Sequence, residues 1–216
     1  MRPSEGLSYP LGGVRLLLGV EGVWVRSATE VLAHTLVRRG DAGVLPLAVT
    51  RSAASVLVAS VAIREVAALR VFRPPAVGDL LTTAVTCLGR RDGGWLLSGR
   101  CTTGETLVAT VSMRVSPCTS AERAEPRLLE SFAHSASLLW SHHGRPRLAA
   151  ARGVVFHQPA PSGGLRTIAR LGPGTPSTMF CRGRTTLVGG PLVMTVDRLV
   201  LTVRRPHDVL RLGHAE

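Results

Sequence analysis

The sequence contains no lysine and no asparagine, and it has only two isoleucines. All 26 basic residues are therefore arginine, which indicates the codon bias of a GC-rich genome rather than a functional choice of arginine over lysine. Aromatic residues make up only 4% of the chain. The 45% of hydrophobic residues must therefore build a core from leucine, valine and alanine.

Signals for a metal site or a membrane segment are also missing. The cysteines have no CxxC spacing, so we expect no zinc site and instead free thiols, buried where they fall in apolar runs. No N-terminal run joins positive charge to an apolar stretch of signal-peptide length, and no apolar span reaches about 18 residues. We therefore expect a soluble cytoplasmic protein with no membrane partner.

The net charge of +12 favours acidic partners such as nucleic acid, anionic lipid, phosphorylated ligands or an acidic carrier protein. Nucleic acid is the weakest of these, because the arginines are scattered along the chain and the few aromatic residues form no stacking platform. We therefore expect no nucleic-acid partner.

An internal repeat is the most informative feature. Phe72–Asp79 (FRPPAVGD) returns 84 residues later as Phe156–Gly163 (FHQPAPSG). Further segments keep this spacing to within one residue: Gly99-Arg100 with Gly183-Arg184, and Leu107–Val111 with Leu192–Val196. The repeat predicts two packed units of about 100 residues, with the functional site at their junction.

The apolar pattern predicts the same order of elements in both units. The first unit should hold a buried helix at Ala48–Ile63 and strands at Val14–Val25, Glu30–Val37, Val66–Arg73, Leu80–Gly89, Gly94–Thr102 and Thr106–Val115. The second should hold a helix at Arg127–Ser141 and strands at Leu148–His157, Gly164–Leu171, Ser177–Thr186 and Leu192–Arg204. Its linker is too short for the two opening strands. We place the units at 1–117 and 127–205, the linker at 118–126 and a tail at 206–216.

This order of helix and strands resembles the hot-dog fold. The strand ending in Phe-x-x-Pro-x-x-x-Gly-Asp at Phe72–Asp79, and the start at Tyr9-Pro10, are most similar to the β-hydroxyacyl-acyl-carrier-protein dehydratase branch of that fold. The resemblance implies an α+β double hot-dog fold with two long helices, each wrapped by antiparallel β-sheet. A likeness in fold does not by itself assign a reaction.

In these dehydratases the central helix carries an acid and, four residues later, a glutamine or histidine. Glu130 and His134 match this spacing, which puts both side chains on one face of the helix. A carboxyl group buried between Leu129 and Phe132 would keep its proton and could donate it to a departing hydroxyl. Alternatively, Glu130 faces solvent and complements the helix dipole, and His134 is an ordinary core or interface residue.

The resemblance also implies a catalytic base, a histidine in the loop before the helix of the paired unit. The corresponding loop, Arg38–Pro46, contains no histidine. His34 lies earlier, in a predicted strand, and Asp41 lies in the loop, so either is a candidate base. Arg51 stands at the matching position of the first helix, so at most one of the two potential sites survives, and that site lacks one of its two usual members.

The resemblance implies a dehydratase of 3-hydroxyacyl thioesters in fatty-acid-like or polyketide biosynthesis. No cofactor is needed, because the thioester itself acidifies the α proton. The expected partners are an acidic acyl carrier protein with a phosphopantetheine-linked acyl chain, and a second hot-dog subunit or further copies of the chain. His157, Phe132 and Arg51 are candidate substrate-binding residues. The alternatives are an acyl thioesterase, with a carboxylate as nucleophile or base, or a catalytically inactive partner subunit.

Overall fold

The computed structural model describes residues 20–38, 44–58, 61–118, 125–140, 146–158 and 163–203. These residues form ten strands and two helices. The first unit contains β1 (Val20–Ser27), β2 (Glu30–Leu36), α1 (Leu45–Val58), β3 (Val61–Val71), β4 (Leu80–Arg91), β5 (Gly94–Thr103) and β6 (Thr106–Pro117). The second contains α2 (Glu125–Leu138), β7 (Arg147–Phe156), β8 (Leu165–Leu171), β9 (Thr178–Leu187) and β10 (Leu192–Thr202).

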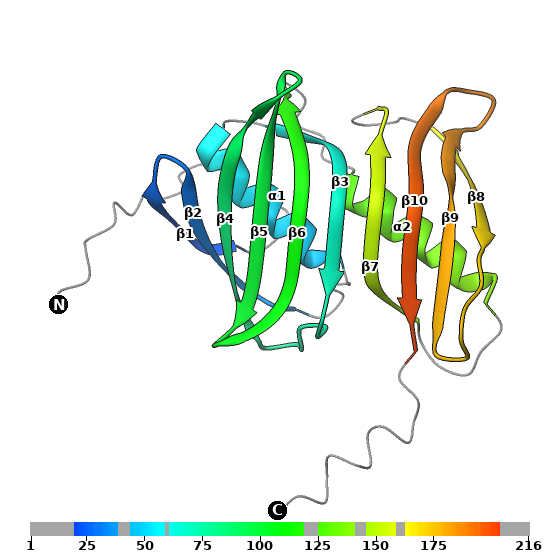
Figure 1. The fold of residues 1–216 in the computed structure, drawn as a ribbon, viewed down its shortest axis with the longest axis horizontal. Coiled ribbons are helices and arrows are strands. Elements are labelled where there is room, and N and C mark those ends of the chain that lie inside the picture. Colours follow the sequence, from blue (N-terminus) through cyan, green and yellow to red (C-terminus); the bar gives the residue numbers. More distant parts are fainter. Residues whose placement is uncertain are drawn as a thin grey trace, which may run out of the picture.

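All ten strands belong to one antiparallel sheet, in the order β1-β2-β4-β5-β6-β3-β7-β10-β9-β8 (Figure 1). The order β4-β5-β6-β3 of the first unit is reversed as β7-β10-β9-β8 in the second. The two units meet where β3 pairs with β7, from Glu65 opposite Val155 to Arg70 opposite Ala150. The units are therefore joined edge to edge, which leaves neither β3 nor β7 as an exposed edge.

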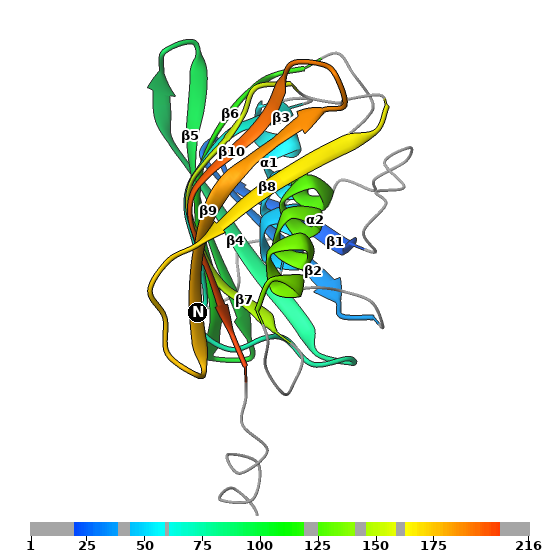
Figure 2. The same ribbon diagram turned by 90° about the vertical axis from the view of Figure 1, so that its right-hand side faces the viewer.

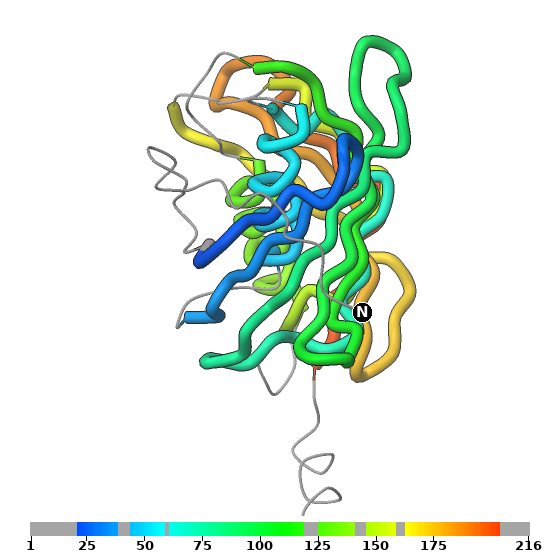
Figure 3. Tube along the Cα trace, turned by 90° about the vertical axis from the view of Figure 1, so that its left-hand side faces the viewer, coloured from blue at the N-terminus to red at the C-terminus, as the bar shows by residue number. Residues whose placement is uncertain are grey.

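Both helices lie on the same face of the sheet (Figure 2). Helix α1 packs against the strands of the first unit, and α2 packs against β8, β10 and α1. Strands β1 and β2 curl away from the plane of the sheet and cover α1 from the side (Figure 3). The predicted pair of long, separately wrapped helices is only partly right, because each helix has 14 residues and both share one continuous sheet.

The predicted repeat is visible in the backbone. The N–H of Arg73 donates to the carbonyl of Val108 at 3.3 Å, and the N–H of His157 donates to that of Val193 at 2.8 Å. Both bonds hold the segment that follows the junction strand of a unit, β3 or β7, to the last strand of that unit, β6 or β10. One cluster of buried apolar residues runs through both units and fills the space between the sheet and the helices.

The first helix and the strand after it differ from the prediction. Helix α1 begins at Leu45, with Pro46 in its first turn, and ends at Val58, and β3 already begins at Val61. Proline is favoured in the first turn of a helix, where its missing N–H has no role. Residues 61–63 leave the helix because they pair with β6, where Ala62 lies opposite Ser116. Tertiary pairing thus overrides an apolar run that has no glycine or proline to end it.

Candidate functional site

Helix α2 exposes the two residues predicted to carry the chemistry. Leu129, Phe132 and Ala136 are buried and form the face that packs into the core. Glu130 and His134 lie on the other side of the helix, and both are exposed. The expectation that Glu130 is buried among leucine and phenylalanine is therefore wrong, although the two side chains do share one face. Glu130 is exposed because the apolar face of α2 packs against the sheet, which turns the opposite face of the helix to solvent.

Of the two candidate bases, the structure places His34, and it does not lie beside this pair. His34 lies half-buried in β2, and its ring contacts that of Trp24 with 4.5 Å between the centroids. Strand β2 packs against α1 in the first unit, far across the sheet from α2 (Figure 1). Asp41 lies outside the described residues. The described part of the chain therefore shows an acid and a neighbouring imidazole, without the predicted base.

The remaining predicted residues have different surroundings. Phe132 is completely buried in the core. His157 is exposed just after β7, and its Nε2 lies 3.3 Å from the hydroxyl of Thr195. The roles of both residues in substrate binding stay predictions.

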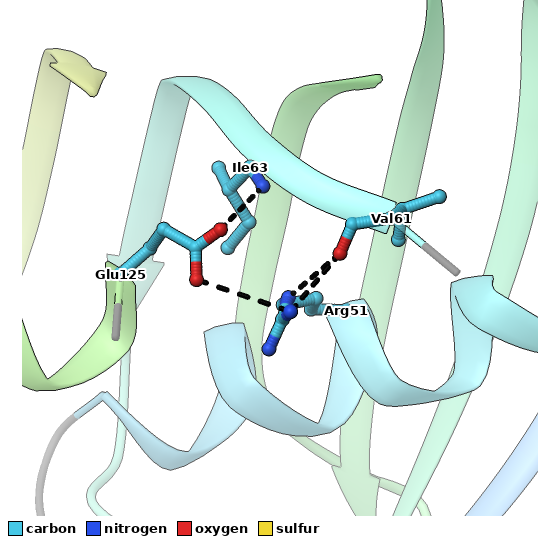
Figure 4. A network of polar contacts seen from close by, with 4 residues as sticks. All are labelled: Arg51, Val61, Ile63 and Glu125. Carbon is cyan, nitrogen blue, oxygen red and sulfur yellow. Dashed lines mark hydrogen bonds and ion pairs between the residues drawn. The ribbon is translucent and has the colours of Figure 1, made fainter. Parts of the chain in front are cut away.

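A buried charged network joins the two units (Figure 4). Arg51 of α1 is 5% exposed, and its Nε and Nη2 donate to the carbonyl of Val61 at 3.3 and 3.0 Å. Glu125, the first residue of α2, is 0% exposed, and its Oε1 accepts the N–H of Ile63 at 3.0 Å. Arg51 Nη2 lies 3.9 Å from Glu125 Oε2. The network thus ties α1, the start of β3 and the start of α2 together.

Sequence reasoning missed Glu125, which it placed in the linker. The dipeptide Glu125-Pro126 carried a signal, since an acid and a proline are both favoured in the first turn of a helix. Its pairing with Arg51, 74 positions earlier, depends on the packing of two helices and has no local signature. With Arg51 buried against Glu125 and Val61, its guanidinium faces the unit junction rather than an exposed surface.

The rest of the described chain adds few candidate groups. Within the ranges given above, no three His, Cys, Asp or Glu residues gather as a metal site would require. Cys101 and Cys181 are buried, as predicted, and burial raises the pKa of each thiol to about 11. Neither of the two described helices is long and apolar enough to cross a membrane.

No protein family model matches the sequence, and no curated protein matches it. Solved structures do. The TesB protein of Mycobacterium avium subspecies paratuberculosis is 11% identical, with a TM-score of 0.67 over 85% of this chain and 96% of that one. A putative oleoyl thioesterase from Lactobacillus plantarum is 8% identical, with a TM-score of 0.63 over 82% of this chain and 96% of that one.

The dehydratase domain of PpsC from Mycobacterium tuberculosis, solved with C12:1-CoA, is 11% identical, with a TM-score of 0.56 over 92% of this chain and 97% of that one. These likenesses fit the double hot-dog fold that the resemblance in sequence implied. Thioesterases and dehydratases share this fold, so the reaction has to be argued from the residues of this chain.

Proposed function

We propose that this protein acts on acyl thioesters as a dehydratase of 3-hydroxyacyl groups, with Glu130 of α2 as the general acid and His134 as its neighbour in the site. The observation that carries the proposal is that both side chains lie one helical turn apart on the exposed side of α2, where a ligand can reach them. Elimination of water needs one group to remove the α proton and one to protonate the departing hydroxyl. Glu130 is the candidate for the group that protonates the departing hydroxyl, so the group that removes the α proton has to come from another segment.

Exposure sets a condition on this chemistry. A carboxyl group keeps its proton at neutral pH only where it is shielded from water. Glu130 would therefore act as an acid only when a bound acyl chain or a second subunit covers α2. The base would come from Asp41 or from a histidine of a second hot-dog subunit, since His34 lies in β2, across the sheet from α2. An acidic carrier protein suits the charge of +12 as the donor of the acyl group.

Hydrolysis is the second candidate reaction. An exposed carboxylate has access to water and could act on it as a base, which is the requirement of a thioesterase. Solved thioesterases share the fold over more than four-fifths of this chain. In the third alternative, the chain is a catalytically inactive subunit that contributes only a surface to a second hot-dog protein.

The products of one incubation separate these alternatives. The full-length protein is mixed with 3-hydroxybutyryl carrier protein, alone and with a hot-dog protein that carries a catalytic histidine, and the carrier is analysed by mass spectrometry. Loss of one water by the chain alone supports the dehydratase. Loss of water only with the added protein supports a heteromeric dehydratase, and free acid supports the thioesterase.

Variants of α2 test whether its exposed residues are needed for the reaction. Glu130→Gln should reduce the rate by about 100-fold or more, the scale of a lost general acid or base. Ser131→Ala, at the neighbouring exposed position, is the matched control and should keep the rate. A rate unchanged in Glu130→Gln would refute the assignment of the site.

A further inference from the structure

Strand β8 ends the described sheet and offers a free edge. It pairs with β9 without a register shift, from Leu165 opposite Leu187 to Leu171 opposite Cys181. The N–H of Gly172 donates to Phe180 at 2.8 Å, so the even-numbered residues exchange bonds with β9. The backbone N–H and C=O groups of the alternate set therefore point away from β9: Leu165, Thr167, Ala169 and Leu171.

In the first unit, the strand equivalent to β8 is covered by a neighbouring strand. Strand β4 occupies the place of β8, and β2 pairs along it with Thr35 opposite Leu81. Leu81 is 0% exposed, whereas Leu165, its counterpart 84 residues later, is 40% exposed. Among the described residues, the second unit has no strand in the place of β2. The edge of β8 therefore keeps apolar surface that β2 buries in the first unit.

The outer face of this edge is basic. Arg166, Ile168 and Arg170 alternate with the residues that face the helices, and all three are exposed. On β9, Arg184 lies opposite Ile168 and Arg182 lies opposite Arg170. Strand β4 has neutral residues at the positions of Arg166, Ile168 and Arg170: Thr82, Ala84 and Thr86. The second unit thus differs from the first in two arginines, Arg166 and Arg170, on a strand that pairs on only one side among the described residues.

A second copy of β8 fits this edge poorly. Antiparallel pairing centred on Ile168 would set Arg166 of each copy opposite Arg170 of the other. Like charges directly opposite each other destabilise a strand pair. The neighbouring groove is lined by Arg170, Arg182 and Arg198, with Asp197 as its one acid. The positive charge of this edge therefore favours a negatively charged partner.

We propose that the free edge of β8 binds an extended segment of a partner protein that carries acidic side chains at alternate positions and apolar side chains between them. Backbone bonds to Thr167 and Ala169 would hold the segment as an eleventh strand. Its acids would face Arg166 and Arg170, and its apolar side chains would cover Leu165 on the helix side. Strand addition at β8 is independent of the reaction at α2.

The test uses the full-length protein and a peptide as long as β8, with valine and glutamate in strict alternation. A peptide with lysine in place of glutamate is the control. The acidic peptide should bind at least tenfold more tightly in a fluorescence anisotropy titration, and its affinity should fall with added salt. Hydrogen exchange should slow at the outward amides of β8.

Two pairs of variants assign the binding to this edge. Thr167→Pro removes an outward N–H and the side-chain hydroxyl that bonds to Thr185 of β9, but no backbone bond to β9, and should lower the affinity about tenfold or more. Thr167→Val, which keeps that N–H, should bind like the original chain. Replacing Arg166 and Arg170 together with glutamine should weaken the acidic peptide by about tenfold or less, since exposed ion pairs are weak.

Three outcomes would overturn the proposal. The first is binding of neither peptide, which would mean that the arginines only protect the edge from unwanted pairing. The second is equal binding of both peptides, or binding that survives in Thr167→Pro. The third is protection of the same amides from exchange in the absence of peptide, if that protection increases with protein concentration. This result would mean that a second copy of the chain binds the edge.

Discussion

Replacing Arg51 with methionine would leave the Glu125 carboxylate as an uncompensated charge inside the protein. Methionine has a similar length and keeps most of the packing of the side chain. Glu125 would retain only the N–H of Ile63 on Oε1, because Oε2 has no hydrogen-bond donor within the described residues. Breaking a buried ion pair by removing one partner costs about 3 to 5 kcal/mol. That is a large share of the about 5 to 15 kcal/mol by which domains are stable.

The second variant separates lost charge from lost hydrogen bonds. In the double variant Arg51→Met, Glu125→Gln, both charges are absent and the amide oxygen can still accept from Ile63. The expected loss is then about 1 to 3 kcal/mol, which corresponds to the hydrogen bonds that Arg51 gives to Val61. The double variant should therefore be more stable than Arg51→Met alone.

The free energy of unfolding is measured by urea titration, followed by circular dichroism and tryptophan fluorescence. Arg114→Met is the matched control, because Arg114 pairs with Glu65 at 3.4 Å with both side chains about one-third exposed. It should cost less than about 1 kcal/mol. If Arg51→Met costs no more than Arg114→Met, or if the double variant is the least stable, the buried pair does not lock the units as argued.

Two more predictions follow from the packing of the core. A Cβ added at Gly99 would lie 2.5 Å from Thr50 Oγ1, so Gly99→Ala should lower the free energy of unfolding by about 1 to 3 kcal/mol, and Thr50→Ala in the same chain should restore most of it in urea titrations. Because the pKa values of Cys101 and Cys181 are about 11 instead of 9.0, the folded chain holds more protons than the unfolded chain between these values, and stability should fall as the pH rises from about 9 to about 11. Because the sequence has no lysine, no lysine side chain titrates in this range. Cys101→Ala with Cys181→Ala should flatten the slope, and an unchanged slope would contradict this assignment.

Most of the strands could be predicted because their signals are local. Alternating apolar residues and glycine-rich turns placed β9 at Ser177–Thr186, within one residue of its observed bounds. The break between α1 and β3 could not be predicted, since residues 61–63 continue an apolar run and become a strand only by pairing with β6.

Two glycines at equivalent positions of the repeat are required for different structural reasons. Gly99 is required by Thr50 of α1, which a Cβ would meet. At Gly183, its counterpart 84 residues later, a Cβ would meet the carbonyl oxygen of Ile168 in β8. Both glycines allow a close approach, but to a helix side chain in one unit and to strand backbone in the other.

The sequence by itself determined that two copies of one helix-and-sheet unit exist, that they differ by two opening strands, and that Glu130 and His134 share a face of the second helix. Only the tertiary structure decided which face of that helix turns to the sheet, that Arg51 meets Glu125 across the junction, and that β8 is an edge strand of the sheet formed by the described residues. The first set depends on periodicity and spacing within short segments. The second depends on contacts between residues far apart in the chain, which no local pattern records.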